Sequence, residues 1–480
     1  MPASGEAAPA RVAVLGAGGF VRDAWVPALK EAAAGGALVV AAVWSRSSES
    51  CWSVLPELQA ISPGCAPFHG DGGLQALMGS PEIDAVLVVL PRQAQGAVIQ
   101  AALRAGKHVL SEKPAAPTLQ QAEQLLAFHA SLPQPAPLWL VAENYRSIPA
   151  FLRLRQAIAA GELGTIVRLD MSADLALAPG NKYYESAWRR DSATMPGAYL
   201  TEGGVHFVAA LRLAAEAAGF GQAVAAAAAS RGVSDDLPHP DCLQGLLWFE
   251  SGASASVSIT TAAGAASIAL RAVGTAGTAE AARGGLGSAG SRTFRLVQQG
   301  ASDAAPTQFE SSSPGLHDEL LSFVRLVHAA GHAGPGGAAR PAAPAGAVAA
   351  AAGGTAAGSL TLTPAEARSA AASDGSDPEA DAAGGRAAAG AAVPGVAWPG
   401  GPSEEGISGG GKGAAAAPAA LGSPAVRDEG RGSGDAIEGL PSEEDAYRIS
   451  AGEAVRDLAV VAALLQSAEQ GGIKVAVRQF

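Results

Sequence analysis

The chain has 480 residues and a formal net charge of −12 at pH 7, so we expect bulk charge to recruit neither a nucleic acid nor a membrane surface. Its three cysteines are too few for a disulfide framework and are not spaced as metal ligands, so we expect no metal site and a reducing compartment, the cytoplasm. No apolar run reaches the roughly 18 residues that a membrane span needs, and the first ten residues lack the features of a signal or transit peptide.

The first part of the chain alternates apolar strand candidates with helix candidates. Strands are predicted at residues 11–16, 38–44, 85–90, 108–111 and 138–142, and helices at residues 23–34, 50–60, 74–78, 94–105 and 119–130. Nearly continuous apolar strands are typical of a sheet that is covered on both faces. The alternation therefore predicts an α/β fold with a doubly wound parallel sheet over residues 11–145, after a disordered N-terminus at residues 1–10.

A different pattern follows in the middle of the chain. Residues 163–178, 242–262, 267–275 and 293–299 have the period-two apolar character of strands. Several of these strands follow one another without helices between them, and one helix is predicted at residues 204–218. This order predicts a second α/β domain over residues 146–330, with an open and mostly antiparallel sheet.

Residues 331–440 consist mainly of Ala, Gly, Pro and Ser, and Trp398 is their only aromatic residue. A segment with so little large apolar surface cannot offset the entropy lost on ordering, so we predict a long disordered insertion. Order is predicted to return over residues 441–480, where Leu458, Val461 and Leu465 share one helical face and a short strand follows. We expect this C-terminal helix and strand to complete the fold.

A glycine-rich turn with Gly16, Gly18 and Gly19 follows the first predicted strand. Glycines at such a turn allow a pyrophosphate to approach backbone N–H groups at the N-terminus of the next helix. Val21 stands where a full dinucleotide fingerprint has a third small residue, and a glycine turn alone can be purely structural. Its place after the first strand of an alternating pattern indicates a Rossmann nucleotide-binding domain.

The end of the second predicted strand indicates which nicotinamide cofactor this domain binds. An NAD-binding domain has Asp or Glu there, which accepts hydrogen bonds from the ribose 2′-hydroxyl and would repel a 2′-phosphate. Ser45 and Arg46 stand there instead, and an arginine flanked by hydroxyl groups suits a 2′-phosphate. We therefore predict NADP(H) rather than NAD(H) as the cofactor; the alternative is that Arg46 is only a solvated loop charge.

Two further motifs contain groups that suit hydride chemistry. Lys113, within Ser-Glu-Lys-Pro at residues 111–114, ends a strand and can hold a carbonyl or hydroxyl oxygen while charge develops on it. Glu202 and His206 are four residues apart, so they share one helical face, where the carboxylate can orient a histidine that exchanges the substrate proton. The alternative for a lone histidine among apolar residues is a place in the core.

In their order along the chain, these motifs resemble the Gfo/Idh/MocA family of nicotinamide-dependent oxidoreductases, which includes glucose–fructose oxidoreductase and inositol dehydrogenase. The resemblance covers residues 11–327 and resumes near residue 446. It rests on GAGG at 16–19, IDAVLVVLP at 83–91, AALRAGKHVLSEKP at 101–114, AENYR at 142–146, WRR at 188–190 and EGGVH at 202–206. Residues 181–206 are especially similar to an NADPH-using fungal and plant subgroup.

The resemblance implies a Rossmann domain followed by an α/β domain whose open sheet forms the face of a homodimer. It also implies that Lys113 contacts nicotinamide and substrate, and that Glu202 and His206 transfer the proton. With these implications we assign the catalytic residues as Lys113, His206 and Glu202. We assign the cofactor site to Gly16, Gly18, Gly19, Phe20, Ser45, Arg46, Leu90, Pro91, Glu112 and Lys113.

The expected function is hydride transfer between NADP(H) and a carbonyl or hydroxyl group of a sugar, polyol, aldehyde or ketone. Substrate contacts are assigned to Asn144, Tyr145, Lys182, Trp188 and Arg189, with ordinary packing as the alternative for Asn144, Tyr145 and Trp188.

Departures from the family pattern favour an alternative function. Glu202 replaces the usual Asp, Gln95 replaces a common His, and Ala209 stands where an Asp is frequent. In that alternative the chain binds NADP(H) as a sensor or regulatory protein and has no turnover.

Overall fold

The computed structural model describes residues 8–177, 179, 184–185, 196–235, 237, 239–284, 293–300, 305–331 and 443–480. Of the segments expected to be disordered, 1–10 and 331–440, residues 1–7 and 332–440 lie outside this described part, and so do the predicted substrate contacts Lys182, Trp188 and Arg189. The N-terminal bound is corrected, because Ala10 is buried as the first residue of strand β1. Within the described residues, no helix is both long enough and apolar enough to cross a membrane.

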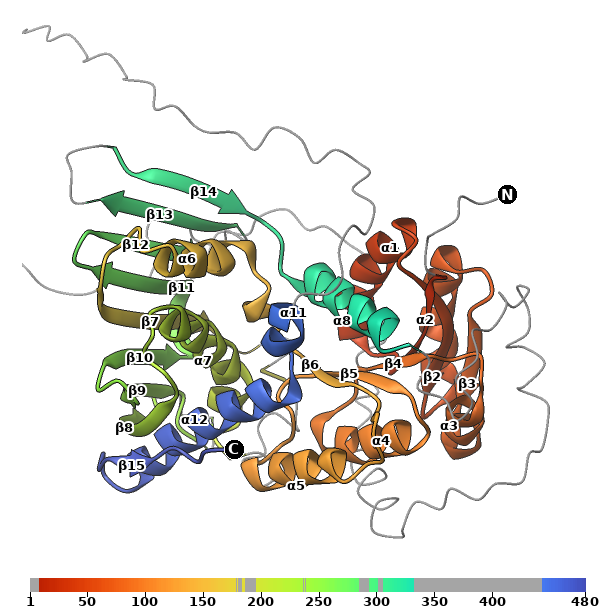
Figure 1. The fold of residues 1–480 in the computed structure, drawn as a ribbon. Coiled ribbons are helices and arrows are strands. Elements are labelled where there is room, and N and C mark those ends of the chain that lie inside the picture. The colour runs from red at the N-terminus through yellow and green to blue at the C-terminus, as the bar shows by residue number, and fades with distance from the viewer. Residues whose placement is uncertain are drawn as a thin grey trace, which may run out of the picture. The chain divides into compact units, whose positions relative to one another are not determined.

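Among the described residues, the first sheet has six parallel strands in the order β3-β2-β1-β4-β5-β6 (Figure 1). The strands are β1 (Ala10–Leu15), β2 (Leu38–Ser45), β3 (Ala66–His69), β4 (Ala85–Val88), β5 (His108–Glu112) and β6 (Trp139–Ala142). The strand order reverses direction between β1 and β4, which creates the switch point at which such sheets bind ligands. The predicted doubly wound parallel sheet is confirmed, and the short β3 is one strand more than the pattern indicated.

Helices cover both faces of the first sheet. They are η1 (Val21–Trp25), α1 (Val26–Ala34), α2 (Ser48–Ile61), α3 (Gly70–Gly79), α4 (Arg92–Arg104), α5 (Leu119–Ala130) and α8 (Leu316–Ala330). Ser47 and Thr118 fix the starts of α2 and α5, because their hydroxyl groups accept hydrogen bonds from backbone N–H groups of the first helical turn. The unpredicted helix α8 returns to this sheet and lies beside α1 (Figure 1). Its Leu320 and Phe323 are buried in the core that α1 and α2 share.

The second sheet has nine described strands in the order β14-β13-β12-β11-β7-β10-β9-β8-β15. They are β7 (Ile166–Ala176), β8 (Ala223–Arg231), β9 (Cys242–Phe249), β10 (Ser254–Thr260), β11 (Ala262–Gly274), β12 (Gly277–Gly284), β13 (Phe294–Gly300), β14 (Thr307–Ser311) and β15 (Val475–Ala476). Every described pair is antiparallel except β7 with β10, so the predicted open and mostly antiparallel sheet is confirmed.

The predicted single strand at residues 242–262 is wrong, because the structure folds these residues into the hairpin β9–β10 and the first residue of β11. The hairpin turn contains Gly252 at φ +85°, in the left-handed region that favours glycine. Strand β8 was not predicted, because its run of alanines has a composition that helices favour.

Helices α6 (Pro149–Ala159), α7 (Tyr199–Ala217) and α12 (Ala451–Glu469) pack against one face of the second sheet, and α11 (Glu443–Arg448) lies between α12 and α8 (Figure 1). Helix α7 begins five residues before its predicted start at residue 204, so Glu202 and His206 both lie within it. Helix α12 packs Leu458, Val461 and Leu464 into the core, as its apolar face predicted.

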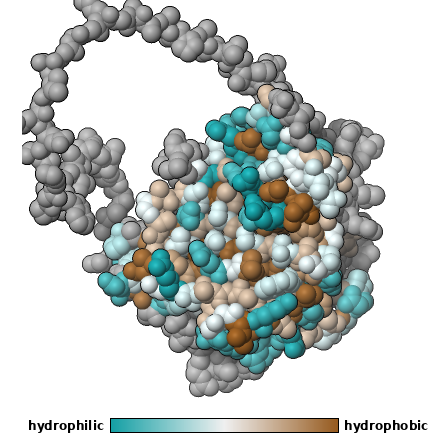
Figure 2. Space-filling model, turned by 90° about the vertical axis from the view of Figure 1, so that its left-hand side faces the viewer, coloured by the Kyte–Doolittle hydropathy of each residue, from teal (hydrophilic) through white to brown (hydrophobic). Residues whose placement is uncertain are grey.

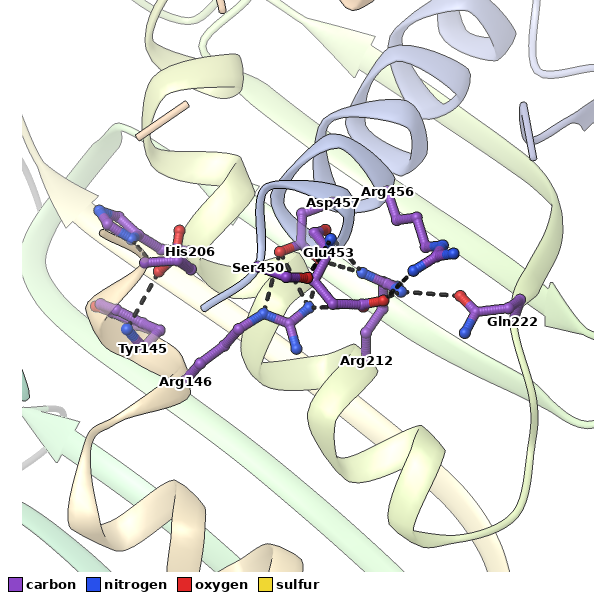
Figure 3. A network of polar contacts seen from close by, with 10 residues as sticks. Tyr145, Arg146, His206, Arg212, Gln222, Ser450, Glu453, Arg456 and Asp457 are labelled. Atoms are coloured by element: carbon purple, nitrogen blue, oxygen red, sulfur yellow. Dashed lines mark hydrogen bonds and ion pairs between the residues drawn. The ribbon is translucent and has the colours of Figure 1, made fainter. Parts of the chain in front are cut away.

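A buried network of charges fastens α12 to the rest of the molecule (Figure 3). Arg146 donates to Asp457 at 2.8 Å, and Arg212 contacts both Glu453, at 2.7 Å, and Asp457. Arg146, Glu453 and Asp457 are each only 1% exposed. Because a buried charge without a partner is costly, each of these side chains depends on the others.

Replacement of Asp457 by Asn should therefore lower the free energy of unfolding by about 3–5 kcal/mol, because it removes the carboxylate that the buried guanidinium groups of Arg146 and Arg212 share. Urea unfolding followed by circular dichroism measures this loss. Glu310→Gln is the matched control: its ion pair with Arg295 is more than half exposed on both sides, so the change should cost less than about 1 kcal/mol. Equal effects of the two substitutions would contradict the importance of the network.

Candidate active site at the carboxyl edge of the first sheet

The glycine turn, Ser45 with Arg46, Leu90 with Pro91, and Lys113 lie in one row, at the edge where the parallel strands of the first sheet end. Neighbouring strands are in register near their ends, where Leu15 pairs with Trp44 and with Val88, Val88 pairs with Ser111, and Glu112 pairs with Ala142. The residues that follow these pairs are therefore neighbours along the edge. In spatial order they are Ser45, Gly16, Leu90, Lys113 and Glu143.

The glycine turn after β1 is closed on one side and open on the other. Gly16 has φ +128°, and a Cβ atom there would lie 2.0 Å from the carbonyl oxygen of Val89, so only glycine fits. Gly18 and Gly19 are exposed, and a Cβ atom on either would meet nothing within 4 Å. The first helical turn begins at Gly19, so the open side of the turn faces a helix N-terminus, where an anion is favoured.

Val21, the departure from the dinucleotide fingerprint, does not fill this open side. It is fully buried in the core that α1 and α2 share, and the helix is wound as a π-helix from Val21 to Trp25. Phe20 is 40% exposed beside the turn. The residues present therefore fit a nucleotide whose pyrophosphate lies over Gly18 and Gly19.

Ser45 and Arg46 lie beside the glycine turn, because the N–H of Gly16 donates to the carbonyl oxygen of Trp44 at 2.8 Å. Ser45 is half-buried at the end of β2, and Arg46 is exposed. On the other side of the turn, the half-buried Leu90 and Pro91 connect β4 to the start of α4.

Lys113 connects the edge of the first sheet to helix α7. Its Nζ atom donates to the carbonyl oxygen of Glu202 at 3.0 Å. Burial lowers the pKa of Lys113, and the nearby carboxylate of Glu202 opposes that change. The preceding Glu112 is buried, accepts a hydrogen bond from Nε1 of Trp25 at 2.7 Å, and has its pKa raised by burial to about 7.

His206 faces a carboxylate that the sequence analysis did not single out. Its Nδ1 atom lies 2.6 Å from Oε1 of Glu143, and the ring of Tyr145 is stacked on it with the ring centroids 4.7 Å apart. Burial lowers the pKa of His206, the charge of Lys113 lowers it further, and the carboxylate of Glu143 opposes both. Glu143 is 2% exposed.

The expected pairing of Glu202 with His206 is replaced in the structure by two separate contacts. The carboxylate of Glu202 forms an ion pair with Arg92 at 2.8 Å, and Arg92 is the first residue of α4. A spacing of four residues on one helix puts two side chains on one face, but it does not exclude closer partners from other elements. Glu143 follows β6 in the segment 142–146, and its position after a strand of a parallel sheet is the signal that could have identified it.

Three other predicted or noted residues have clear places. The side-chain amide of Asn144 donates to the carbonyl oxygen of Pro314 at 2.7 Å, so it fastens the segment before α8. Tyr145 is 7% exposed, and burial raises its pKa to about 12. Gln95, where the family often has His, is 1% exposed, and neither polar atom of its side-chain amide has a partner among the described residues. Buried amides of this kind normally meet a ligand or an ordered water.

Two family models match the chain, and together they cover more than half of it. The model described as "Oxidoreductase family, NAD-binding Rossmann fold" matches residues 10–134, and the "GFO/IDH/MocA C-terminal domain" matches residues 151–280. The dehydrogenase FPY6 of Fusarium mangiferae is 35% identical over 213 residues, which are 43% of this chain and 58% of that protein. The chain thus spans little more than half the length of this curated relative.

Solved structures have the same fold. An oxidoreductase from Thermotoga maritima has a TM-score of 0.55 and 22% identity, covering 72% of this chain and 93% of that one. KijD10, a 3-ketoreductase from Actinomadura kijaniata solved with NADP and TDP-benzene, has a TM-score of 0.54 and 23% identity, covering 68% of this chain and 91% of that one. With both domain models matched in order and the sheet topology described above, this chain belongs to the Gfo/Idh/MocA family of oxidoreductases.

Proposed function

We propose that this protein is an NADP(H)-dependent oxidoreductase that transfers a hydride between nicotinamide and a carbonyl or hydroxyl carbon of a sugar, polyol, aldehyde or ketone. The observation that carries the proposal is the place of Lys113. Lys113 lies at the carboxyl edge of the first sheet, and its Nζ atom donates a hydrogen bond to the backbone carbonyl oxygen of Glu202. Glu202 lies on α7, one helical turn before His206. The cation of Lys113 and the imidazole of His206 therefore lie near the place where the nicotinamide end of a nucleotide bound at the glycine turn would be.

The cofactor would be held along the carboxyl edge. Gly16, Gly18, Gly19 and Phe20 would surround the pyrophosphate, and Ser45 with Arg46 would bind the 2′-phosphate of NADP(H). Arg46 is exposed beside the turn, and a guanidinium group suits a phosphate in charge and geometry. Leu90, Pro91, Glu112 and Lys113 would line the nicotinamide end.

The protein side chains would divide the chemistry between them. Nicotinamide, when bound, supplies or accepts the hydride. Lys113 would donate a hydrogen bond to the substrate oxygen and stabilise the negative charge that develops there. His206 would give a proton to that oxygen in reduction and take it back in oxidation. Asn144, Tyr145, Lys182, Trp188 and Arg189 are proposed to contact the substrate. The name of the 3-ketoreductase KijD10 supports a ketone as the substrate class.

The same proposal includes a homodimer and a cytoplasmic location. Helices pack against one face of the second sheet. Figure 2 shows the side of the molecule where this sheet lies, a surface of mostly intermediate hydropathy with scattered hydrophobic and hydrophilic residues. Along β9 the inward Leu243 and Leu247 are buried, whereas the outward Leu246 is 46% exposed. An outward leucine on a sheet face suits contact with a second copy of the chain. The three cysteines are free thiols, which is in keeping with a reducing compartment.

Arg46→Ala tests the choice of cofactor. A hydrogen bond to a charged group is worth about 1.5–3 kcal/mol, so the substitution should raise the Kd for NADPH by about 10- to 150-fold. The Kd for NADH should not change. Fluorescence titration with both nucleotides measures the effect, and Arg295→Ala, at an exposed arginine of β13, is the control. Equal binding of NADPH and NADH by the unaltered protein would contradict the role of Arg46.

Lys113→Met tests the catalytic proposal. Loss of a group that stabilises developing charge should reduce kcat by about 10²- to 10³-fold while the Kd for NADPH stays nearly constant. A panel of sugar and polyol ketones followed by NADPH absorbance measures turnover, and Lys30→Met, at an exposed lysine of α1, is the control. An unaltered protein that binds NADPH and reduces no carbonyl in the panel would instead favour the non-catalytic sensor.

Light scattering tests the homodimer, whose mass should be about twice the 47.3 kDa of one chain. Leu246→Glu puts a charge on the outward face of β9 and should yield monomers. Trp52→Glu changes a 57% exposed residue of α2, away from this face, and should leave the dimer intact. A monomeric unaltered protein would contradict the proposal.

A further inference from the structure

We propose that Glu143 is the positioning residue of His206, which it holds with the proton on Nδ1 and the acceptor lone pair on Nε2. The inference rests on the proposed function, because it specifies how the proton-transferring histidine of that reaction is kept ready. It assigns to Glu143 the part that the sequence pattern gave to Glu202.

The contact itself determines which ring nitrogen has the proton. The distance from Nδ1 of His206 to Oε1 of Glu143 is 2.6 Å, which is a short hydrogen bond. Burial alone would raise the pKa of Glu143, but the charge of His206 and its hydrogen bond outweigh burial and hold that pKa below its ordinary value. An ionised carboxylate can only accept, so Nδ1 must be the donor, and Nε2 of the neutral ring is then an acceptor.

Both the carboxylate of Glu143 and the chain segment that follows it are held in place by hydrogen bonds. It is the residue before the short helix η2 (Asn144–Arg146), and the backbone N–H of Tyr145 donates to its Oε1 at 3.1 Å. The Tyr145 ring covers one face of the imidazole at an interplanar angle of 21°. The last residue of η2, Arg146, donates to Asp457 of α12 (Figure 3). Glu143 can therefore hold the imidazole because the segment around it is anchored in the core.

Glu202 is less suited than Glu143 to position the ring of His206. Its carboxylate is engaged by Arg92 at 2.8 Å, and its backbone carbonyl accepts from Lys113 at 3.0 Å. It contributes to the charge around His206, as Lys113 does, but more weakly than Glu143. Among the described residues, the charged groups that act most strongly on the pKa of His206 are Glu143, Lys113 and Glu202.

In the direction of oxidation, the substrate hydroxyl would lose its proton to Nε2 of His206 while its carbon loses hydrogen with the electron pair to oxidised nicotinamide. The product carbonyl, reduced nicotinamide and an imidazolium balance that step. The carboxylate of Glu143 stabilises the imidazolium without taking its proton. Reduction runs the same transfers backwards.

Glu143→Gln tests the inference, because it keeps the shape of the side chain and removes its charge. The ¹⁵N NMR signals of His206, assigned by comparison with His206→Gln, report both its pKa and the nitrogen that is protonated. Without the carboxylate, the pKa of His206 should fall by about 1–3 units. Glu202→Gln, the matched change on the neighbouring carboxylate, should lower it less and leave the proton on Nδ1.

Turnover gives a second readout. Glu143→Gln should reduce kcat by up to about 10²- to 10⁴-fold, the range that general acid–base catalysis contributes, with a small effect on KM. In a His206→Gln background it should have no further effect, because the residue acts through His206. If Glu143 had a purely structural role, the losses of kcat caused by Glu143→Gln and His206→Gln would multiply in the double variant. That result would overturn the inference.

Glu143→Asp keeps the proposal testable if the Gln variant does not fold. The shorter carboxylate retains the charge, so the pKa of His206 should stay closer to that of the unaltered protein than any neutral variant allows, while kcat falls. An unchanged His206 titration in Glu143→Gln, or a larger shift in Glu202→Gln, would overturn the proposal. The NMR measurement needs no turnover, so failure of the proposed function would be seen separately, as absence of NADPH oxidation by the unaltered protein.

Discussion

The hydrogen bond from Lys113 to the carbonyl oxygen of Glu202 is the contact on which the candidate site depends. Lys113 follows β5 of the first sheet, whereas Glu202 lies on α7, which packs against the second sheet. An ammonium group that is partly removed from water needs such partners, because its desolvation is costly. The candidate site therefore forms only where the first sheet with its helices contacts the second sheet with its helices. Neither sheet supplies both Lys113 and His206 alone.

The C-terminal segment is needed to hold the two sheets and their helices together at the candidate site. The carbonyl oxygen of Ile449 accepts from the N–H of Val141 beside the free edge of β6, and β15 pairs with the edge of β8. Between these contacts, Glu453 and Asp457 of α12 neutralise Arg146 and Arg212 in the core. Residues more than 300 positions apart thus hold η2, and with it the pair of Glu143 and His206, in place.

The first sheet could be predicted because its strands are continuous apolar runs separated by helices, a pattern that depends on local sequence. The second sheet was only partly predictable, since the alanines of β8 favour helix locally and become a strand only through pairing with β9. The glycine turn, Ser45 and Lys113 were identifiable from their places at strand ends. Glu143 also follows a strand of this sheet, but the sequence analysis did not single it out, because its partner His206 is 63 residues away and a nearer carboxylate, Glu202, matched the helical spacing.

Deuterium transfer is the most direct test of the claim that this edge of the sheet is a hydride-transfer site. The protein would be incubated with NADPH that is fully deuterated at nicotinamide C4 and with sugar ketones, and the products analysed by mass spectrometry. The expected result is one deuterium on the carbon of the new hydroxyl group. Binding of NADPH without deuterium in any product would contradict catalysis and favour the non-catalytic alternative.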